Sequence, residues 1–366
     1  MPFKIFNPFA LNYLKPLLFF NILFCIFFLP TLCFAQQQLT GKIVDQESGK
    51  NLEGVNIYID GSSLGTITDK EGVFKLNVEE NTNALLIVRY LGYETKALPI
   101  NQKGKLVDFG TIDLKLQPES IEGVVLEADP WSREKKLRYF REYFLGEDYQ
   151  EKDCKILNED KIRLRFRPSK KELKAWCEVP LQIENPYLGY IIEYSLKDFS
   201  INFTSSKRIL LSGQQVYRPQ TFFLSGSSYF KELKKRVRRR YIKRREETYY
   251  GSIMHFMRSL SKEKLEENDY RIFHKRYERP LYQYLKVNQK ENQSEITLLK
   301  PRLTILYNNN LDHQSFVQSA YPKKDSLMFT IDNYGNFYPA TLFYFGGAMG
   351  KQKVSSLLPL NYQPPD

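Results

Sequence analysis

Residues 39–98, LTGKIVDQESGKNLEGVNIYIDGSSLGTITDKEGVFKLNVEENTNALLIVRYLGYETKAL, decide the fold of the first part of this chain. Apolar residues alternate with polar ones at 55–59 and at 73–78, which is the pattern of strands with one buried face. The clusters between such runs are rich in Asp, Ser and Gly, which favour tight turns. Several short strands at this spacing predict an all-β sandwich.

The same stretch carries a family pattern. Residues 41–78, GKIVDQESGKNLEGVNIYIDGSSLGTITDKEGVFKLNV, contain the core GT-x-TD-x-x-G-x-F and precede LGYE at 91–94. This resembles the carboxypeptidase-regulatory-like domain, a transthyretin-like β-sandwich. In that family the domain accompanies metallocarboxypeptidase catalytic domains or precedes the plug of TonB-dependent outer-membrane transporters. Asp69 and Gly72 could form a calcium or ligand pair, but turn chemistry accounts for both residues.

Residues 1–35 are typical of a secretory signal peptide. Lys4 and Lys15 provide positive charge, and residues 17–29 form an apolar run shorter than the ~20 residues that cross a bilayer. We therefore expect export to the periplasm, the outer membrane or the cell surface, with no transmembrane span in the mature chain. An uncleaved anchor is the alternative.

The sequence predicts a mainly β protein with an α+β part. We expect a β-sandwich at 36–118, a linker at 119–130 and a mixed α+β domain at 131–366 with a basic helical insertion at about 227–268. Stretches such as LQIENPYLGYIIEYSLKDF and the terminal LLPLNYQP resemble exported Gram-negative proteins that join this sandwich to a region of unassigned function. That resemblance implies no activity.

Local signals place several elements of the second part. Ser132 is a suitable N-cap for a helix that Gly146 would end, and its apolar side chains recur at helical spacing. Pro301 interrupts residues 297–307, which predicts an edge strand or two short strands. Residues 327–331 predict a strand that leads into a turn.

Positive charge is concentrated in one segment. The chain has 54 Lys and Arg against 42 Asp and Glu, a net charge of +12. Residues 231–245 hold ten Lys or Arg and one Glu, so most of the excess lies there. The candidate contacts for an anionic partner are Lys234, Lys235, Arg236, Arg238, Arg239, Arg240, Lys243, Arg244 and Arg245.

Export argues against nucleic acid as the partner of this segment. Anionic lipid, lipopolysaccharide and an acidic protein stay open as partners. The simpler interpretation is a solvated basic helix that docks through Leu233, Val237 and Tyr241, which are four residues apart.

Cysteine and histidine usage limits the chemistry. Cys154 and Cys177 could form a disulfide in an oxidising compartment, or both could be small buried residues of one sheet. None of His255, His274 and His313 has Glu three residues later, so the zinc-binding pattern of a carboxypeptidase is absent from the sequence. We expect no metal, cofactor or catalytic site.

The sequence thus favours a non-enzymatic interaction or scaffold protein of the cell envelope. The alternative is an envelope enzyme that acts on glycans through a carboxylate pair, which the sequence does not locate. A purely structural surface protein is a third interpretation.

Overall fold

The computed structural model describes residues 36–79, 84–100, 104–117, 127–209, 215–290 and 293–365. Gln37–Asp366 form one compact unit. The predicted signal peptide and most of the predicted linker lie outside the described residues. Those two assignments and the domain boundaries therefore stay predictions.

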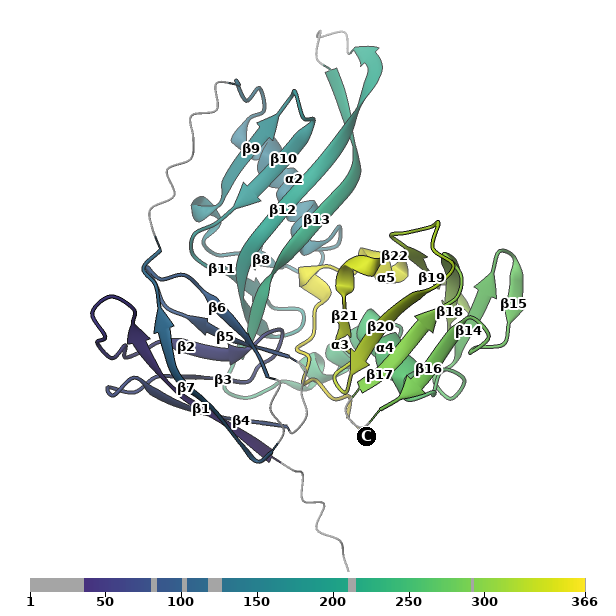
Figure 1. The fold of residues 1–366 in the computed structure, drawn as a ribbon. Helices are drawn as coiled ribbons and strands as arrows, with labels where there is room; N and C mark the ends of the chain where they lie inside the picture. The colour runs from purple at the N-terminus through teal and green to yellow at the C-terminus, as the bar shows by residue number, and fades with distance from the viewer. Residues whose placement is uncertain are drawn as a thin grey trace, which may run out of the picture. The chain divides into compact units, whose positions relative to one another are not determined.

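The first seven strands form the predicted sandwich (Figure 1). One sheet has the order β4–β1–β7 and the other β3–β2–β5–β6. Alternate side chains from both sheets, including Ile57, Phe74 and Leu86, meet in one apolar core. The strands are β1 (Gln36–Asp45), β2 (Asn56–Ile59), β3 (Gly65–Ile67), β4 (Val73–Glu79), β5 (Leu85–Arg89), β6 (Lys96–Pro99) and β7 (Leu106–Leu114).

The turn before β4 explains Asp69 and Gly72. The Asp69 carboxylate accepts hydrogen bonds from the backbone N–H groups of Glu71 at 3.1 Å and Val73 at 2.8 Å. Gly72 has φ +75°, and a Cβ there would lie 2.6 Å from the Ile43 carbonyl oxygen. Turn geometry thus accounts for both residues.

A second sheet follows, with the order β8–β11–β12–β10–β9, and β13 pairs with β12. The pairing of β12 and β13 extends from Tyr190 opposite Glu232 to Ile209 opposite Gln215, so these long strands run side by side (Figure 1). The strands are β8 (Lys155–Ile156), β9 (Arg163–Arg167), β10 (Glu172–Trp176), β11 (Leu181–Asn185), β12 (Tyr190–Ile209) and β13 (Gln215–Glu232).

Helix α2 (Arg133–Leu145) forms where the sequence predicts it and packs on this sheet. The Ser132 hydroxyl caps it by accepting the Lys135 N–H, and Gly146 ends it with φ +114°. Phe140 stacks with Phe144 at 4.9 Å between ring centroids, and both rings are fully buried in the core that α2 shares with the sheet.

The last part contains two further sheets, with orders β15–β14–β18–β19–β22 and β16–β17–β20–β21. Pro301 separates β17 from β18, which belong to different sheets, so the two-strand alternative is correct. The elements are α4 (Ile253–Ser261), β14 (Tyr270–His274), β15 (Tyr277–Arg279), β16 (Leu285–Gln289), β17 (Gln293–Leu298), β18 (Arg302–Tyr307), β19 (Asn310–Ser319), β20 (Leu327–Asp332), β21 (Phe337–Tyr338), β22 (Phe343–Gly347) and α5 (Ala348–Lys351).

The predicted helical insertion at about 227–268 contains two helices, but its predicted bounds are too wide. Its first six residues belong to β13, because pairing with β12 buries Phe230 in the sheet core. Residues 233–238 form a connection to α3 (Arg239–Tyr249). Gly251, with φ +76°, then separates α3 from α4.

The turn after β2 joins the sandwich to β13. Gly61 donates its N–H to the Ser228 carbonyl at 2.8 Å, and the Ser228 N–H donates to the Asp60 carboxylate at 2.9 Å. The Phe230 N–H donates to the Ser62 carbonyl at 2.9 Å, and the Leu360 N–H near the C-terminus donates to the Gly61 carbonyl at 2.7 Å. This turn therefore meets both β13 and the C-terminal tail.

Candidate functional site

Seven of the nine predicted cations are exposed on one continuous segment, which we call the basic surface. Among the described residues, the six of these cations between Lys234 and Arg240 have no carboxylate partner within 4.0 Å. The seventh, Lys243, lies 3.7 Å from Glu247. The basic surface consists of Lys234, Lys235, Arg236, Arg238, Arg239, Arg240 and Lys243.

The position of these charges on α3 is unfavourable for the helix itself. Arg239 and Arg240 lie in its first turn, which contains no acidic residue, and Arg238 makes no side-chain cap. The positive end of the helix dipole repels cations at that place. These cations therefore do not stabilise α3, and helix stability does not explain why they are there.

Arg245 is not available to a partner, so its predicted role as a contact for an anionic partner is wrong. Its side chain is 7% exposed and forms a two-pronged ion pair with Glu232 at 2.9 and 2.7 Å. Its Nε donates to the Leu188 carbonyl at 2.8 Å, and the guanidinium lies 3.8 Å from the Tyr190 ring centroid. The physical reason is that Arg245 lies on the buried face of α3.

Arg244 is half-buried and has a similar role. Its guanidinium lies 4.5 Å from the Tyr187 ring centroid, and Nη1 donates to the Tyr187 carbonyl at 3.3 Å. A cation held over an aromatic ring in this way supports packing of the helix on the sheet.

The predicted docking stripe is only partly correct. Tyr241 is buried, and its ring lies so close to Gly189 that a Cβ there would be 2.4 Å away. Leu233 and Val237 precede the helix. Val237 is 36% exposed and Ile242 41% exposed, so two apolar side chains lie among the cations. Both line a shallow hollow of the basic surface together with Lys234, Arg236, Arg238 and Arg239.

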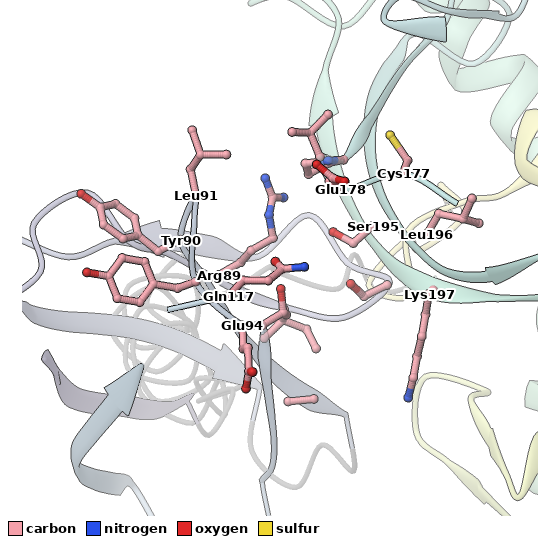
Figure 2. A pocket seen from close by; sticks show the side chains of 18 of the residues that line it. Arg89, Tyr90, Leu91, Glu94, Gln117, Cys177, Glu178, Ser195, Leu196 and Lys197 are labelled. Atoms are coloured by element: carbon pink, nitrogen blue, oxygen red, sulfur yellow. The ribbon is translucent and has the colours of Figure 1, made fainter. Parts of the chain in front are cut away.

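A cleft of about 610 Å³ lies between the sandwich and the second sheet. Figure 2 shows Arg89, Glu94 and Gln117 on the sandwich side and Glu178 and Ser195 on the other. The lining carries both signs of charge, with Asp60 and Lys197 also part of it.

The cleft supplies little for catalysis. Among the described lining residues there is no histidine, and burial raises the pKa of the Cys177 thiol, which disfavours the nucleophilic thiolate. Of its carboxylates, Asp60 accepts the Ser228 N–H and Glu94 lies 3.8 Å from Lys115. The glycan-enzyme alternative stays a prediction that no observed geometry favours.

The structure contains free thiols at Cys154 and Cys177, so the disulfide alternative is not observed. Cys154 directly precedes β8 and Cys177 directly follows β10. β8 pairs with β11 beside residues 190–194 of β12, whereas β10 pairs with residues 199–202 of β12. Because these positions lie along β12 at about 3.3 Å per residue, the two cysteines are roughly 20 Å apart, about three times the Cα separation that a disulfide tolerates. Burial raises the pKa of Cys154 to about 12.

His255 is a structural residue. It is 3% exposed, and its Nδ1 lies 2.9 Å from the Tyr270 hydroxyl and 3.1 Å from the Gly251 nitrogen. Its Nε2 lies 3.2 Å from the Asn268 side-chain oxygen, and burial lowers its pKa. Within the described ranges, no three His, Cys, Asp or Glu side chains are grouped so that they could hold a metal ion.

None of the helices in the described part of the chain has the length and apolar character needed to cross a membrane.

The comparisons concern mainly the sandwich. The TonB-dependent receptor P39 of Formosa agariphila is 34% identical over 92 residues, which is 25% of this chain and 8% of the receptor. The TonB-dependent receptor SusC of Bacteroides thetaiotaomicron is 34% identical over 73 residues, which is 20% of this chain and 7% of the receptor. The matches thus span less than a tenth of these relatives.

Among solved structures, a type II cohesin–X-dockerin complex from Acetivibrio cellulolyticus has a chain that is 15% identical. The match covers 30% of this chain and 76% of that one, with a TM-score of 0.21, and it supports no argument about function. The family model of the CarboxypepD_reg-like domain matches residues 39–126. Those residues, whose described part is the β-sandwich, form a CarboxypepD_reg-like domain.

Proposed function

We propose that this protein is a non-enzymatic interaction protein of the cell envelope that attaches to an anionic lipid surface through its basic surface. The observation that supports this most strongly is the group of six exposed cations between Lys234 and Arg240, at and just before the N-terminus of α3, for which the described residues supply no carboxylate partner. The named relatives of the sandwich are TonB-dependent receptors, and the predicted signal peptide indicates export; both support an envelope location.

Lipid fits the basic surface better than an acidic protein or a soluble anion. Val237 and Ile242 expose apolar side chains among the cations. A lipid surface can accommodate both kinds of group, because anionic headgroups attract the cations and the boundary of the acyl region accepts the apolar side chains.

The expected effect of neutralisation follows from general magnitudes. Each Lys or Arg near an anionic membrane contributes about 1 kcal/mol, so removing three charges weakens binding by roughly 100-fold. The attraction is screened as salt increases from about 0.1 M to 1 M, over which the Debye length falls from about 10 to 3 Å.

The test is cosedimentation of the purified chain with vesicles of phosphatidylglycerol and phosphatidylcholine in equal parts, with pure phosphatidylcholine vesicles as the neutral reference. The variant is Arg238→Gln, Arg239→Gln, Arg240→Gln. The matched control is Lys262→Gln, Lys286→Gln, Lys323→Gln, which removes three exposed charges elsewhere.

We expect the wild type and the control to bind the anionic vesicles and the arginine variant to lose most of its binding. Equal binding by the variant and the control would show that the attraction is not localised to the basic surface. Equal binding to neutral vesicles would show that charge is not its source. Either result refutes the proposal.

A further inference from the structure

A second cavity, of about 790 Å³, lies where the sandwich, strands β12 and β13 and the C-terminal part meet. We call it the Asp60 cavity. Most of its described lining is apolar, and the side chains of Leu85 at 39% and Tyr338 at 74% exposure lie on it. Its principal apolar side chains are Leu85, Phe230, Ile253, Met254, Phe337 and Leu358.

Several polar side chains of this lining are already hydrogen-bonded within the protein. The Ser252 hydroxyl accepts the His255 N–H at 3.0 Å, and the Gln352 side-chain oxygen accepts the Ile253 N–H at 3.2 Å. The Thr248 hydroxyl donates to the Arg244 carbonyl at 2.7 Å. These side chains bond backbone groups of α3 and α4, so they are occupied within the protein.

Asp60 differs from these groups. One of its carboxylate oxygens accepts the Ser228 N–H at 2.9 Å, and it forms no ion pair among the described residues. It is the one carboxylate in the described lining of this cavity, and that lining contains no Lys, Arg or His. Burial raises the pKa of Asp60, which is the expected effect when a carboxylate lacks a cation.

Asp60 also lines the cleft described above, but on the side of this cavity its surroundings are mostly apolar. A carboxylate in such surroundings is stabilised most by a cation that forms a charge-assisted hydrogen bond. The apolar walls in turn favour a ligand whose body is hydrocarbon. An anion would meet the carboxylate directly, and a neutral apolar molecule would leave its charge uncompensated.

From this geometry we propose that the Asp60 cavity binds a small amphiphilic cation, in which an apolar body carries one ammonium group that pairs with Asp60. This site uses none of the residues of the basic surface and selects the opposite charge. This proposal can therefore be tested independently of the lipid attachment.

The experiment is isothermal titration calorimetry of the full chain with three probes of equal length, octylammonium, 1-octanol and octanoate. We expect octylammonium to bind about tenfold or more tightly than 1-octanol, as for hydrogen bonds to charged groups, and octanoate to bind most weakly. Asp60→Asn keeps a side-chain oxygen for the Ser228 N–H, so it should remove the preference for octylammonium while 1-octanol binds as before.

Two further variants make the result specific. Glu178→Gln removes a carboxylate from the neighbouring cleft and should keep the wild-type preference. Ala340→Trp adds bulk to the lining with Asp60 intact and should weaken the binding of octylammonium and 1-octanol alike. The proposal is overturned if the wild type binds no probe, if it binds octylammonium and 1-octanol equally, or if Asp60→Asn keeps the preference.

Discussion

Asp332, at the end of β20, is buried and forms no ion pair within the described part of the chain, and this predicts a measurable dependence of stability on pH. The side chain is 3% exposed. Its Oδ1 accepts the N–H groups of Tyr334 and Asn336, each at 2.9 Å, whereas the buried Oδ2 has no hydrogen-bond partner among the described residues. Burial raises its pKa to about 6, although Arg258 acts in the opposite direction.

The direction of this pH dependence is set by the difference between the pKa of Asp332 in the folded protein and in the unfolded chain. The pKa of Asp332 is about 6 in the folded protein, against 3.8 for an unperturbed aspartate, so the folded state binds the proton more tightly than the unfolded chain does. The stabilisation by the protonated form is complete below pH 3.8 and is lost as the pH rises through 6. At about 1.36 kcal/mol for each pKa unit, the total loss is about 3 kcal/mol. About 2 kcal/mol of it falls between pH 4.5 and 7.5.

The perturbation is Asp332→Asn, which keeps an oxygen for both N–H groups and cannot ionise. Urea unfolding of both proteins at several pH values gives the difference in their free energies of unfolding. The free energy of unfolding of the variant minus that of the wild type should increase by about 2 kcal/mol from pH 4.5 to pH 7.5. This change with pH is expected whichever protein is the more stable at any one pH. A difference that does not change with pH, or that changes in the other direction, refutes the assignment of a raised pKa to Asp332.

Two other predictions concern the packing of α3, and urea unfolding checks both. Arg245→Met should cost roughly 2 kcal/mol, because it removes a buried guanidinium that pairs with the partly exposed Glu232 and donates to the Leu188 carbonyl. Arg239→Met on the exposed side should change stability by about 0.5 kcal/mol or less; equal costs would contradict the distinction between them. Gly189→Ala should cost roughly 3 kcal/mol because the new methyl group meets the Tyr241 ring, whereas Gly92→Ala, with φ +85° and open space around it, should cost about 1 kcal/mol. Similar losses in the two alanine variants would contradict the close contact at Gly189.

Local patterns were sufficient for the sandwich and for α2. Alternation over a few residues identifies a half-buried strand, and a serine cap with helical spacing identifies α2. The same kind of reasoning failed at residues 227–232, because their strand state depends on pairing with β12 at 190–195. That pairing is distant in the sequence and outweighs the helical character of the basic residues that follow.

The candidate site was predictable only in outline. Arg239 and Arg245 look alike as members of a basic run, yet one is exposed and the other is buried. A signal was present, because Tyr241, Arg245 and Tyr249 recur every four residues and form the buried face of α3. Asp60 offered no such signal, since it reads as a turn residue and its cavity is assembled from three distant parts of the chain.

The most direct test of the central claim is whether the basic surface itself touches lipid. A bimane fluorophore would be attached at Val237→Cys in a Cys25→Ser, Cys33→Ser, Cys177→Ser background, in which the buried Cys154 is kept. The control position is Leu311→Cys, since Leu311 is 76% exposed in the native chain. With vesicles that contain phosphatidylglycerol and brominated lipid, we predict quenching of the label at position 237 and unchanged fluorescence at position 311. Binding to the vesicles without quenching at position 237 would contradict the account.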